Sequence, residues 1–478
     1  MSDLIDKAVF NNASHAARAR ADAWAPWIVE ARAVGRLAAP LIFTQLAQMA
    51  ILTTDVLLLG RLGKTALASA AIGNTVFYFG WLIGGGPASA VSPMIAHIRG
   101  QRAGNKGGVR ASLRMGLWSI AILALPMFIV LWCATPILLA LHQEPMLAEG
   151  AGKFVAALSF GLPFSLGYIV LRNFATALGH PRAGLVVMLA TIAVNALLGY
   201  TLIFGHFGAP RLGIIGSGIG TTISNVFSFV AMLAVIHLTP DLRAYRMFRR
   251  FWRPVGVKLA EVFRLGLPIG MTMIFEAMLF NSMTLVMGSF GANALAAHQI
   301  ALNFASITFM VPLGFGMACT VRVGVATGRG DPHAARRAGL TAMALGVAFI
   351  AACGLGMALF GDAIAGLYLG GRARSDLQVM ALAAVFLKVA AAFQVFDALQ
   401  VVAAQALRGL KDARAPMFIA AGCYWLIGAP ACLFLGLTLH MQGLGIWIGL
   451  AIALAAAAVA LCARFWRLTK AMTIPKIA

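Results

Sequence analysis

The sequence predicts an all-α integral membrane protein with twelve transmembrane helices, arranged as two pseudo-symmetric six-helix bundles. Its 478 residues are 61% hydrophobic and only 11% charged, whereas a soluble domain carries about 25% charged residues. Apolar runs of roughly 20 residues, the length that crosses a bilayer, recur along the whole chain. The second half of the chain also repeats the pattern of the first. Together these observations exclude a soluble globular protein.

Twelve spans are expected where the apolar runs lie between clusters of charged and turn-forming residues. The spans cover residues 37–60, 66–96, 114–141, 154–178, 183–205, 212–238, 265–289, 294–321, 339–361, 379–407, 416–439 and 443–463. Six spans form a first lobe at 37–238 and six form a second lobe at 265–463. The first 36 residues are polar and mixed, so we expect a tail at 1–36 and no cleavable signal peptide.

The basic residues predict one orientation of these spans. With the N-terminus inside, 30 of the 37 Lys and Arg residues fall on inner segments or at the helix ends beside them, and 6 fall on outer loops. This partition predicts that both termini, including the tail at 464–478, are cytoplasmic. It also explains the net charge of +22. Because no aromatic residues able to stack on bases accompany most of the basic clusters, we expect no nucleic-acid partner.

The most basic inner segment, residues 239–264, separates the two lobes. Its aromatic residues alternate with arginines, which is typical of a helix that lies on an anionic membrane surface. A plain linker between two lobes is the alternative, and the two interpretations are compatible. Membrane lipids are therefore expected partners of this segment.

An internal repeat relates the two halves. The segment LAAPLIFTQLAQMA aligns with LGLPIGMTMIFEAM when the first is shifted by 228 residues, and the same shift pairs Gly60 with Gly288 and Gly63 with Gly291. Each half has an even number of spans, so the two repeats run parallel and are related by an axis along the membrane normal. Two such bundles around a central cavity are typical of secondary transporters.

Three of the fifteen acidic residues fall inside predicted spans: Asp55, Glu276 and Asp397. Glu276 follows Arg264 by 12 residues, and Asp397 precedes Arg408 by 11 on a helix that runs the opposite way. Both acids should therefore lie roughly 16–18 Å from the inner boundary. An ionisable group at that depth costs about 2.5–3.5 kcal/mol or more, which makes it a candidate functional residue.

Glu276 and Asp397 belong to the same lobe, so they can share one pocket. Two carboxylates in a low-dielectric medium repel each other, and they relieve the repulsion by sharing a proton or by holding a hard cation through their oxygens. Either arrangement exchanges H⁺ or Na⁺. The alternative is that each carboxyl stays protonated and only bridges neighbouring helices.

Weaker candidates lie nearer the outer side. Asp55 precedes Arg61 by six residues, and its expected partners in the first lobe are Asn195 and Thr221. Such polar residues form an ion site or simply bridge helices. His298 and Gln299 start the eighth span, where they act in a proton relay or make interfacial hydrogen bonds.

Enzyme motifs are absent from the sequence. None of the nine histidines belongs to an HExxH motif, and neither a GxSxG motif nor a phosphate-binding GxxxxGK[ST] loop occurs. The six cysteines show no metal-ligand spacing. We therefore expect no enzymatic activity and no cofactor, and no metal beyond a coupling Na⁺.

Several motifs resemble those of a known transporter family. TTDVLLLGRLG, IFEAML, AAHQIALNF, FQVFDALQ, LRGLKDARAP and YWLIGAP followed by GLGIWIGLA resemble the MATE (multidrug and toxic compound extrusion) transporters, and among them the bacterial NorM type. The similarity covers nearly all of residues 35–465. It implies a multi-pass protein of the bacterial inner membrane that exports cationic, lipophilic drugs in exchange for Na⁺ or H⁺.

The resemblance also implies roles for individual residues. Glu276 and Asp397 match the second-lobe acids that bind the coupling cation in NorM-type members, and Asp376 matches a further acid near the outer face. In the first lobe, Asp55 matches the family's Asp, and Asn195 and Thr221 match its polar partners.

Two positions depart from the family pattern. Gly199 stands where the family usually has Asp or Asn, which leaves the first-lobe site incomplete. Phe393 stands where relatives often carry Tyr, so a cation–π face is kept and a hydroxyl is lost.

Cation-coupled drug efflux is the leading hypothesis. The alternatives are a flippase or exporter of a lipid-linked or anionic metabolite, and a non-transporting membrane scaffold. We expect a monomer. At the shift of 228, Gln48 is the first-lobe counterpart of Glu276. Later in each lobe LGHPR (178–182) aligns with LKDAR (410–414) at a shift of 232, and at that shift Ser165 is the counterpart of Asp397. The acid pair therefore occurs in one lobe only, and the coupling cation is expected in the second lobe.

Overall fold

The computed structural model describes residues 2–102, 104–368 and 374–472, and the side chains of residues 24–102, 104–366 and 377–472. Across these residues every regular element is a helix. Eleven helices are long and apolar enough to cross a membrane, and a bent pair of helices brings the number to twelve. The prediction of an all-α membrane protein with twelve spans is confirmed.

The first lobe contains the spans before the basic linker. Its helices are α1 (Ser2–Leu62), α2 (Lys64–Gln101), α3 (Lys106–Trp132), α4 (Ala134–Ala140), α5 (Pro145–Ser159), α6 (Leu162–Ala177), α7 (Arg182–Phe204) and α8 (Ile214–Leu238). The fourth span consists of α5 and α6, which meet at an angle of 46°. Pro163, in the first turn of α6, has no N–H to continue the α5 ladder, so the break lies where the sequence weakens the helix.

The second lobe repeats this order after a short helix α9 (Pro240–Arg243). It contains α10 (Gly256–Gly288), α11 (Ala292–Gly328), α12 (Pro332–Leu359), α13 (Gly361–Tyr368), α14 (Arg374–Gly409), α15 (Arg414–Ala421), α16 (Ala429–Leu433) and α17 (Gln442–Ala471). The span that includes α15 and α16 contains two π-helical segments, η1 (Gly422–Gly428) and η2 (Phe434–Thr438). Such widened turns redirect side chains within a span and often occur at functional sites.

The linker between α9 and α10 is not the surface helix that its arginines and aromatic residues suggest. Residues 244–255 form turns, with positive φ angles at Arg246 and Arg250. Their carbonyl groups accept hydrogen bonds from α3: Arg110 Nε donates to Tyr245 O at 2.7 Å, and Trp118 Nε1 donates to Phe251 O at 3.1 Å. Because the side chains of α3 satisfy these carbonyls, the linker does not need helical hydrogen bonds of its own.

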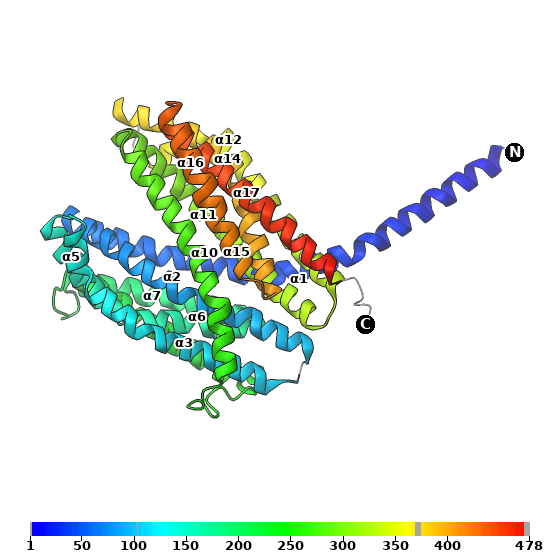
Figure 1. Ribbon diagram of the computed structural model, residues 1–478, viewed down its shortest axis with the longest axis horizontal. Coiled ribbons are helices and arrows are strands. Elements are labelled where there is room, and N and C mark those ends of the chain that lie inside the picture. Colours follow the sequence, from blue (N-terminus) through cyan, green and yellow to red (C-terminus); the bar gives the residue numbers. More distant parts are fainter. Residues whose placement is uncertain (1, 103, 369–373, 473–478) are drawn as a thin grey trace.

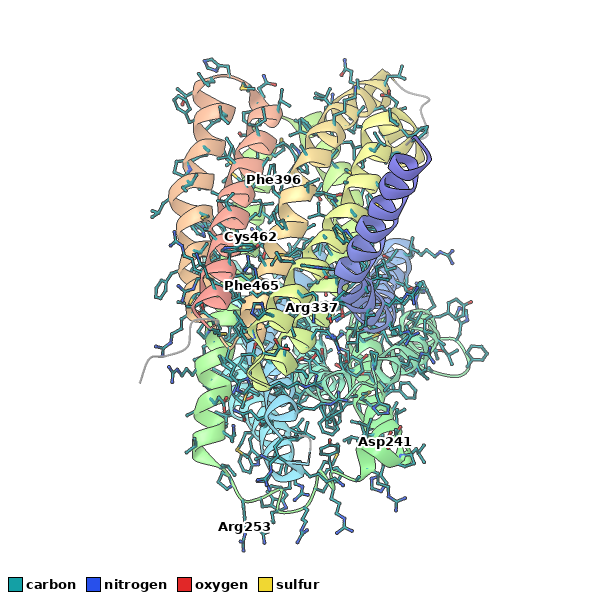
Figure 2. All side chains as sticks on the ribbon, turned by 90° about the vertical axis from the view of Figure 1, so that its right-hand side faces the viewer. Asp241, Arg253, Arg337, Phe396, Cys462 and Phe465 are labelled. Atoms are coloured by element: carbon teal, nitrogen blue, oxygen red, sulfur yellow. The ribbon has the colours of Figure 1, made fainter. Side chains whose placement is uncertain are left out.

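The two lobes converge at one end and diverge at the other (Figure 1). The C-terminal ends of α2, α8, α11, α14 and α17 lie at the converging end, which we call the basic end. Figure 2 looks onto this end, where Arg253 marks the tip of the linker and Arg337 lies on α12 of the second lobe. Each lobe has its own apolar core, and a smaller cluster at the basic end joins Met94 and Met115 of the first lobe to Val262, Leu265 and Ile269 of α10.

Two helices cross from one lobe to the other. The first half of α1, with Val34, Ala38 and Leu41, packs into the core of the second lobe. The first half of α10 packs in the same way against the first lobe. Both helices contain a proline at the crossing, Pro40 and Pro268, which are separated by the repeat shift of 228. Each proline removes one helical hydrogen bond and leaves the helix easier to bend there.

Glycines make the close contacts between the lobes. A Cβ on Gly86 of α2 would lie 2.2 Å from the carbonyl oxygen of Gly266 on α10. A Cβ on Gly100 would lie 2.2 Å from the oxygen of Val325, and one on Gly328 would lie 2.2 Å from the oxygen of His97. Only residues without a side chain permit backbones this close, so these positions set the distance between lobes at the basic end.

Candidate functional site

The two deep acids of the second lobe meet in its interior. Glu276 lies in the second half of α10, and Asp397 lies on α14 within Coulombic range of it. Gln400, one turn after Asp397, donates from Nε2 to Glu276 Oε1 at 3.4 Å and also interacts with the Asp397 carboxylate. The i, i+3 spacing on α14 places Asp397 and Gln400 on one face, so the amide lies between the two acids.

Part of this site lacks hydrogen-bond partners among the described residues. Asp397 is 7% exposed, and its Oδ1 is buried with no partner. The hydroxyl of Tyr424, in the π-helical segment η1, is also buried without one, and it lies within Coulombic range of both acids. Buried polar atoms are nearly always paired in folded proteins. Carboxylate, amide and phenol oxygens are the ligands that a hard cation such as Na⁺ takes, and the protonated form of either acid would also supply a donor.

A cationic side chain completes the cluster. Arg408, near the end of α14, lies within Coulombic range of Glu276 and Tyr424. Sequence reasoning used Arg408 only to mark the inner boundary and therefore missed it. The sequence did contain a signal for Arg408. It follows Asp397 by eleven residues, and at about 100° per residue this spacing places both side chains on nearly the same face of the helix.

The site also faces the first lobe. Tyr78 of α2 lies within Coulombic range of Glu276 and stacks on Trp81, with ring centroids 6.1 Å apart. Trp81 Nε1 donates to Ser165 Oγ at 3.2 Å. Ser165 is the first-lobe counterpart of Asp397. At this site the second lobe therefore presents acidic side chains, whereas the first lobe presents the aromatic pair Tyr78 and Trp81. Tyr78 is 48% exposed, so its ring is free to contact a bound molecule.

An aromatic cluster lies beside the acids within the second lobe. Phe393 is only 2% exposed, and its ring makes edge contacts with Phe280 and Trp447 at centroid distances of 5.9 and 5.4 Å. His298 packs its ring against Trp447 at 5.5 Å, and His298 Nε2 lies 3.1 Å from Thr284 Oγ1. Phe393 and His298 are therefore packed core residues.

Of the other two predicted second-lobe residues, one lies apart from this cluster and one has a side chain outside the described residues. Gln299 is exposed at the start of α11. The side chain of Asp376, on the first turn of α14, lies outside the described residues.

The first-lobe candidates come together around Asp55. Thr221 Oγ1 on α8 donates to Asp55 Oδ2 on α1 at 3.2 Å, and Asp55 is 9% exposed. Asn195 of α7 lies beside the carboxylate, but neither of its amide atoms has hydrogen-bond geometry to a described partner. Gly199, one turn further along α7, leaves room for Leu58, which a Cβ there would approach to 2.8 Å. An apolar side chain therefore occupies the position where a fourth polar group would lie.

The groups that can hold a cation are thus carboxylate, amide and phenol oxygens rather than transition-metal ligands. Among the described residues, no group of three or more His, Cys, Asp or Glu side chains gathers as metal ligands do.

Comparison with known proteins identifies the family. The profile of the MatE family matches the chain twice, at residues 40–201 and 268–434. The two matches start 228 residues apart, the shift found for the internal repeat. The chain belongs to the MatE family. The predicted resemblance to MATE transporters is confirmed, and the two matched segments are the two repeats.

Curated relatives extend this MatE assignment over most of the chain. "Probable multidrug resistance protein NorM" of Mesorhizobium japonicum is 44% identical over 422 residues, which are 88% of this chain and 90% of the relative. "Multidrug resistance protein NorM" of Burkholderia vietnamiensis is 40% identical over 438 residues, with 91% and 94% covered. The resemblance to the NorM type is confirmed as well.

Solved transporter structures share the fold. The eukaryotic MATE transporter AtDTX14 superposes with a TM-score of 0.82 at 20% identity, covering 93% of this chain and 98% of that one. A MOP superfamily transporter from Pyrococcus furiosus gives a TM-score of 0.83 at 19% identity, with 93% and 97% covered. At these identities the likeness concerns the fold alone.

Proposed function

We propose that the chain is a secondary multidrug antiporter, which exports cationic lipophilic compounds in exchange for Na⁺ or H⁺ bound by Glu276 and Asp397. The observation that carries the proposal is the junction of these two acids through Gln400, with Asp397 Oδ1 buried and unpartnered among the described residues. Its curated relatives are named as multidrug resistance proteins, which supports the same function.

The charges around Glu276 explain how an ion can be exchanged. Without a bound cation, Arg408 offsets one of the two carboxylates through space. A proton or Na⁺ entering between Glu276 and Asp397 offsets the other, and the Gln400 amide turns between donating and accepting. The ion's binding energy therefore depends on how closely α10 and α14 approach each other.

The path of α10 couples this site to the lobes. Glu276 lies eight residues after Pro268, and the part of α10 before Pro268 packs against the first lobe. A movement of Glu276 toward Asp397 bends α10 at the proline and shifts the helix segment that holds the lobes together. The ion and the drug need not bind together, because each needs only to prefer a different arrangement of the lobes.

The exported compound would bind between the lobes. Tyr78 and Trp81 offer aromatic faces that attract cations, and the carboxylate of Glu276 lies within Coulombic range of Tyr78. A lipophilic cation therefore competes with the coupling ion for the same negative charge. This competition is what exchange requires.

The orientation follows from charge. The basic end carries most of the Lys and Arg residues, so we place it in the cytoplasm of a bacterial inner membrane, with both termini there. The lobes then diverge toward the outside, which is the side from which a coupling ion driven by the membrane gradient arrives.

Ethidium transport in proteoliposomes tests the proposal. Glu276→Gln and Asp397→Asn should each reduce export driven by a Na⁺ or pH gradient to background, while both proteins remain monodisperse in detergent. Glu149→Gln is the matched control, because that side chain is 64% exposed and its ion pair among the described residues is with the exposed Lys153. Wild-type rates in both variants would reject the assignment. Dissipating the two gradients separately decides between Na⁺ and H⁺.

One observation favours a second candidate, the export of a lipid-linked or anionic compound. Arg408 places a positive charge in the same cluster. In that case an anionic dye, and not ethidium, would be exported, and Arg408→Gln would abolish its transport.

A further inference from the structure

We propose that an anionic phospholipid binds through its headgroup phosphate in a groove at the basic end, between α1, the turn before α7, and α8. The groove encloses about 580 Å³. It is lined by residues from both ends of the turn and from three helices: Arg36, Leu37, Gly179, His180, Pro181, Arg182, Ala183, Val186, Val235 and Thr239. It lies away from the acid pair, so this site is separate from the one proposed for the coupling ion.

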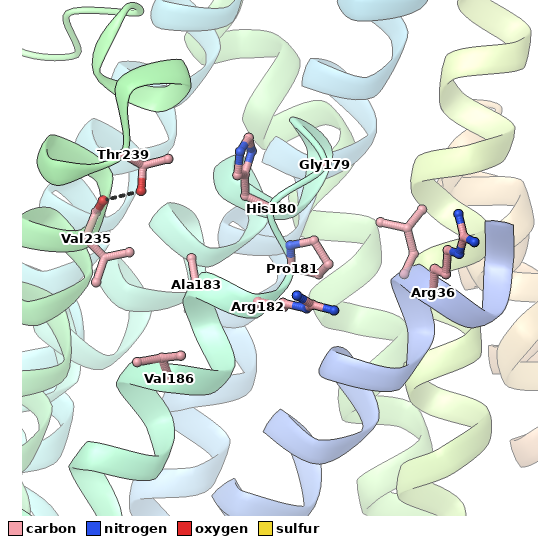
Figure 3. Close-up of a pocket in the computed structure, with 10 residues that line it drawn as sticks. Arg36, Gly179, His180, Pro181, Arg182, Ala183, Val186, Val235 and Thr239 are labelled. Carbon is pink, nitrogen blue, oxygen red and sulfur yellow. Dashed lines mark hydrogen bonds between the residues drawn. The ribbon is translucent and has the colours of Figure 1, made fainter.

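The charge of the groove selects an anion. Arg36 on α1 and Arg182 on the first turn of α7 are both exposed, and they lie on opposite walls (Figure 3). No Asp or Glu is among the lining residues. Asp241, whose carboxylate lies 3.5 Å from the lining residue His180, is 81% exposed and is not itself part of the lining. The two guanidinium groups are therefore not neutralised within the groove, and a guanidinium binds a phosphate with two parallel hydrogen bonds.

A third arginine lies behind the turn. Arg99 of α2 donates from Nη1 to the carbonyl oxygen of Ala177 at 3.0 Å, and its guanidinium lies beside Gly179. Thr239 does not compete for a ligand, because its hydroxyl donates to Val235 O at 2.8 Å, as Figure 3 shows. The polar wall of the groove is thus mainly cationic.

An apolar lining adjoins these arginines, and an exposed apolar surface continues from it along α7. Leu37, Ala183, Val186 and Val235 form this lining. Below Val186, the exposed residues of α7 follow at helical spacing: Leu189, Ala193 and Leu197. A phosphate held at the arginines would therefore have an apolar track running from it into the bilayer. This arrangement fits a phospholipid and does not fit a soluble phosphate, which has no acyl chain to cover the track.

The groove also lies where the lobes join. Leu37 packs against the apolar core of the second lobe, whereas His180, Arg182 and Val235 belong to the first. A lipid that contacts both walls bridges α1, in the segment docked on the second lobe, to α7 and α8. Its binding should therefore favour the arrangement in which the lobes converge at the basic end.

Native mass spectrometry of the purified full-length chain in detergent tests this inference without drug or ion gradient, so the result is independent of the transport proposal. Titration with phosphatidylglycerol should give one bound lipid per chain. The double variant Arg36→Gln/Arg182→Gln should lower the affinity for this lipid by about tenfold or more, because two charge-assisted contacts are lost. Arg467→Gln, an exposed arginine of the basic end on the second lobe, should leave the affinity unchanged. Phosphatidylethanolamine should bind more weakly than phosphatidylglycerol.

Three outcomes would overturn the inference. The first is that the double variant Arg36→Gln/Arg182→Gln binds phosphatidylglycerol as tightly as Arg467→Gln does. The second is that the wild-type protein binds phosphatidylethanolamine as tightly as phosphatidylglycerol. The third is that millimolar inorganic phosphate displaces the lipid, which would identify a soluble-anion site. The variant Arg36→Lys/Arg182→Lys controls for misfolding as a cause of lost lipid binding, because it changes the same two positions and keeps both positive charges. It should retain more lipid than the glutamine variant, and equal loss in both pairs with intact monodispersity would also reject a phosphate site.

Discussion

Arg322 on α11 donates two hydrogen bonds to the carboxylate of Glu30 on α1, from Nε to Oε1 at 2.8 Å and from Nη2 to Oε2 at 2.5 Å. The Glu30 side chain is 7% exposed and that of Arg322 is 36% exposed. Glu30 lies near the start of the first candidate membrane span, Trp24–Leu62, yet its partner belongs to the second lobe. The pair thus fixes the start of the first membrane helix to the lobe that carries the acid pair.

Removing one member of this pair should destabilise the protein. Glu30→Gln leaves the partly exposed Arg322 guanidinium with a weaker acceptor, so we expect a loss of stability of about 1–2 kcal/mol. Thermal unfolding of the purified protein in detergent measures the change. In a double-mutant cycle with Arg322→Gln, the double variant should lose less than the two single losses together. Strict additivity would show that the pair contributes no coupling energy. The exposed pair Glu149–Lys153, 3.8 Å apart, is the control and should contribute less than about 1 kcal/mol.

The glycine contact between α2 and α11 should keep the lobes together at the basic end. Gly100 and Gly328 are counterparts at the repeat shift, and each would place a Cβ 2.2 Å from a carbonyl oxygen of the opposite helix. Gly100→Val must therefore push the helices apart. Hydrogen–deuterium exchange should rise in residues 90–102 and 320–328. Gly356→Val, where a Cβ would meet nothing within 4 Å, should leave exchange in these segments unchanged. Unchanged exchange in Gly100→Val would contradict the role of this contact.

The sequence predicted the acid pair because depth is readable from spacing. Glu276 and Asp397 lie at matched distances from basic residues, and rigid helices of constant rise turn that match into proximity. Gln400 and Arg408 were missed for a different reason. Both residue types are common at helix surfaces and ends, and only the rotation of α14 about its axis decides whether they face Glu276.

The path of the linker and the docking of α1 were also beyond the sequence. Residues 244–255 have the composition of a surface helix, but their conformation is decided by Arg110 and Trp118 of α3, which lie more than 130 residues away in the chain. Likewise, the polarity of the first 36 residues suggests a tail, whereas Glu30 and Val34 are buried against the second lobe. Contacts between distant segments leave no periodic pattern in either segment.

Arg408 should weaken the binding of the coupling ion. Its positive charge lies within Coulombic range of Glu276 and competes with an entering cation. Arg408→Gln should therefore lower the Na⁺ or H⁺ concentration that half-saturates ethidium export, by roughly threefold to tenfold. Slower ion release should at the same time reduce the maximal rate. Lys388→Gln is the control on the same helix, because Lys388 is exposed and should not affect ion dependence. A higher half-saturating concentration in Arg408→Gln would instead mean that Arg408 organises the acid pair.

Asp55 should affect transport without setting the ion dependence. It has one hydrogen-bond donor, Thr221, at 3.2 Å, and Leu58 occupies the space beside Gly199 where a further ligand would be needed. Asp55→Asn should therefore lower the maximal rate of ethidium export several-fold and leave the half-saturating ion concentration unchanged, whereas Glu276→Gln reduces gradient-driven export to background at every ion concentration. Thr221→Val, which removes only the hydroxyl donor, should have a smaller effect in the same direction. Export measured across a series of Na⁺ concentrations and pH values separates these outcomes. A several-fold change of the half-saturating ion concentration in Asp55→Asn would contradict this prediction and would place a second coupling site in the first lobe, despite the missing ligand at Gly199.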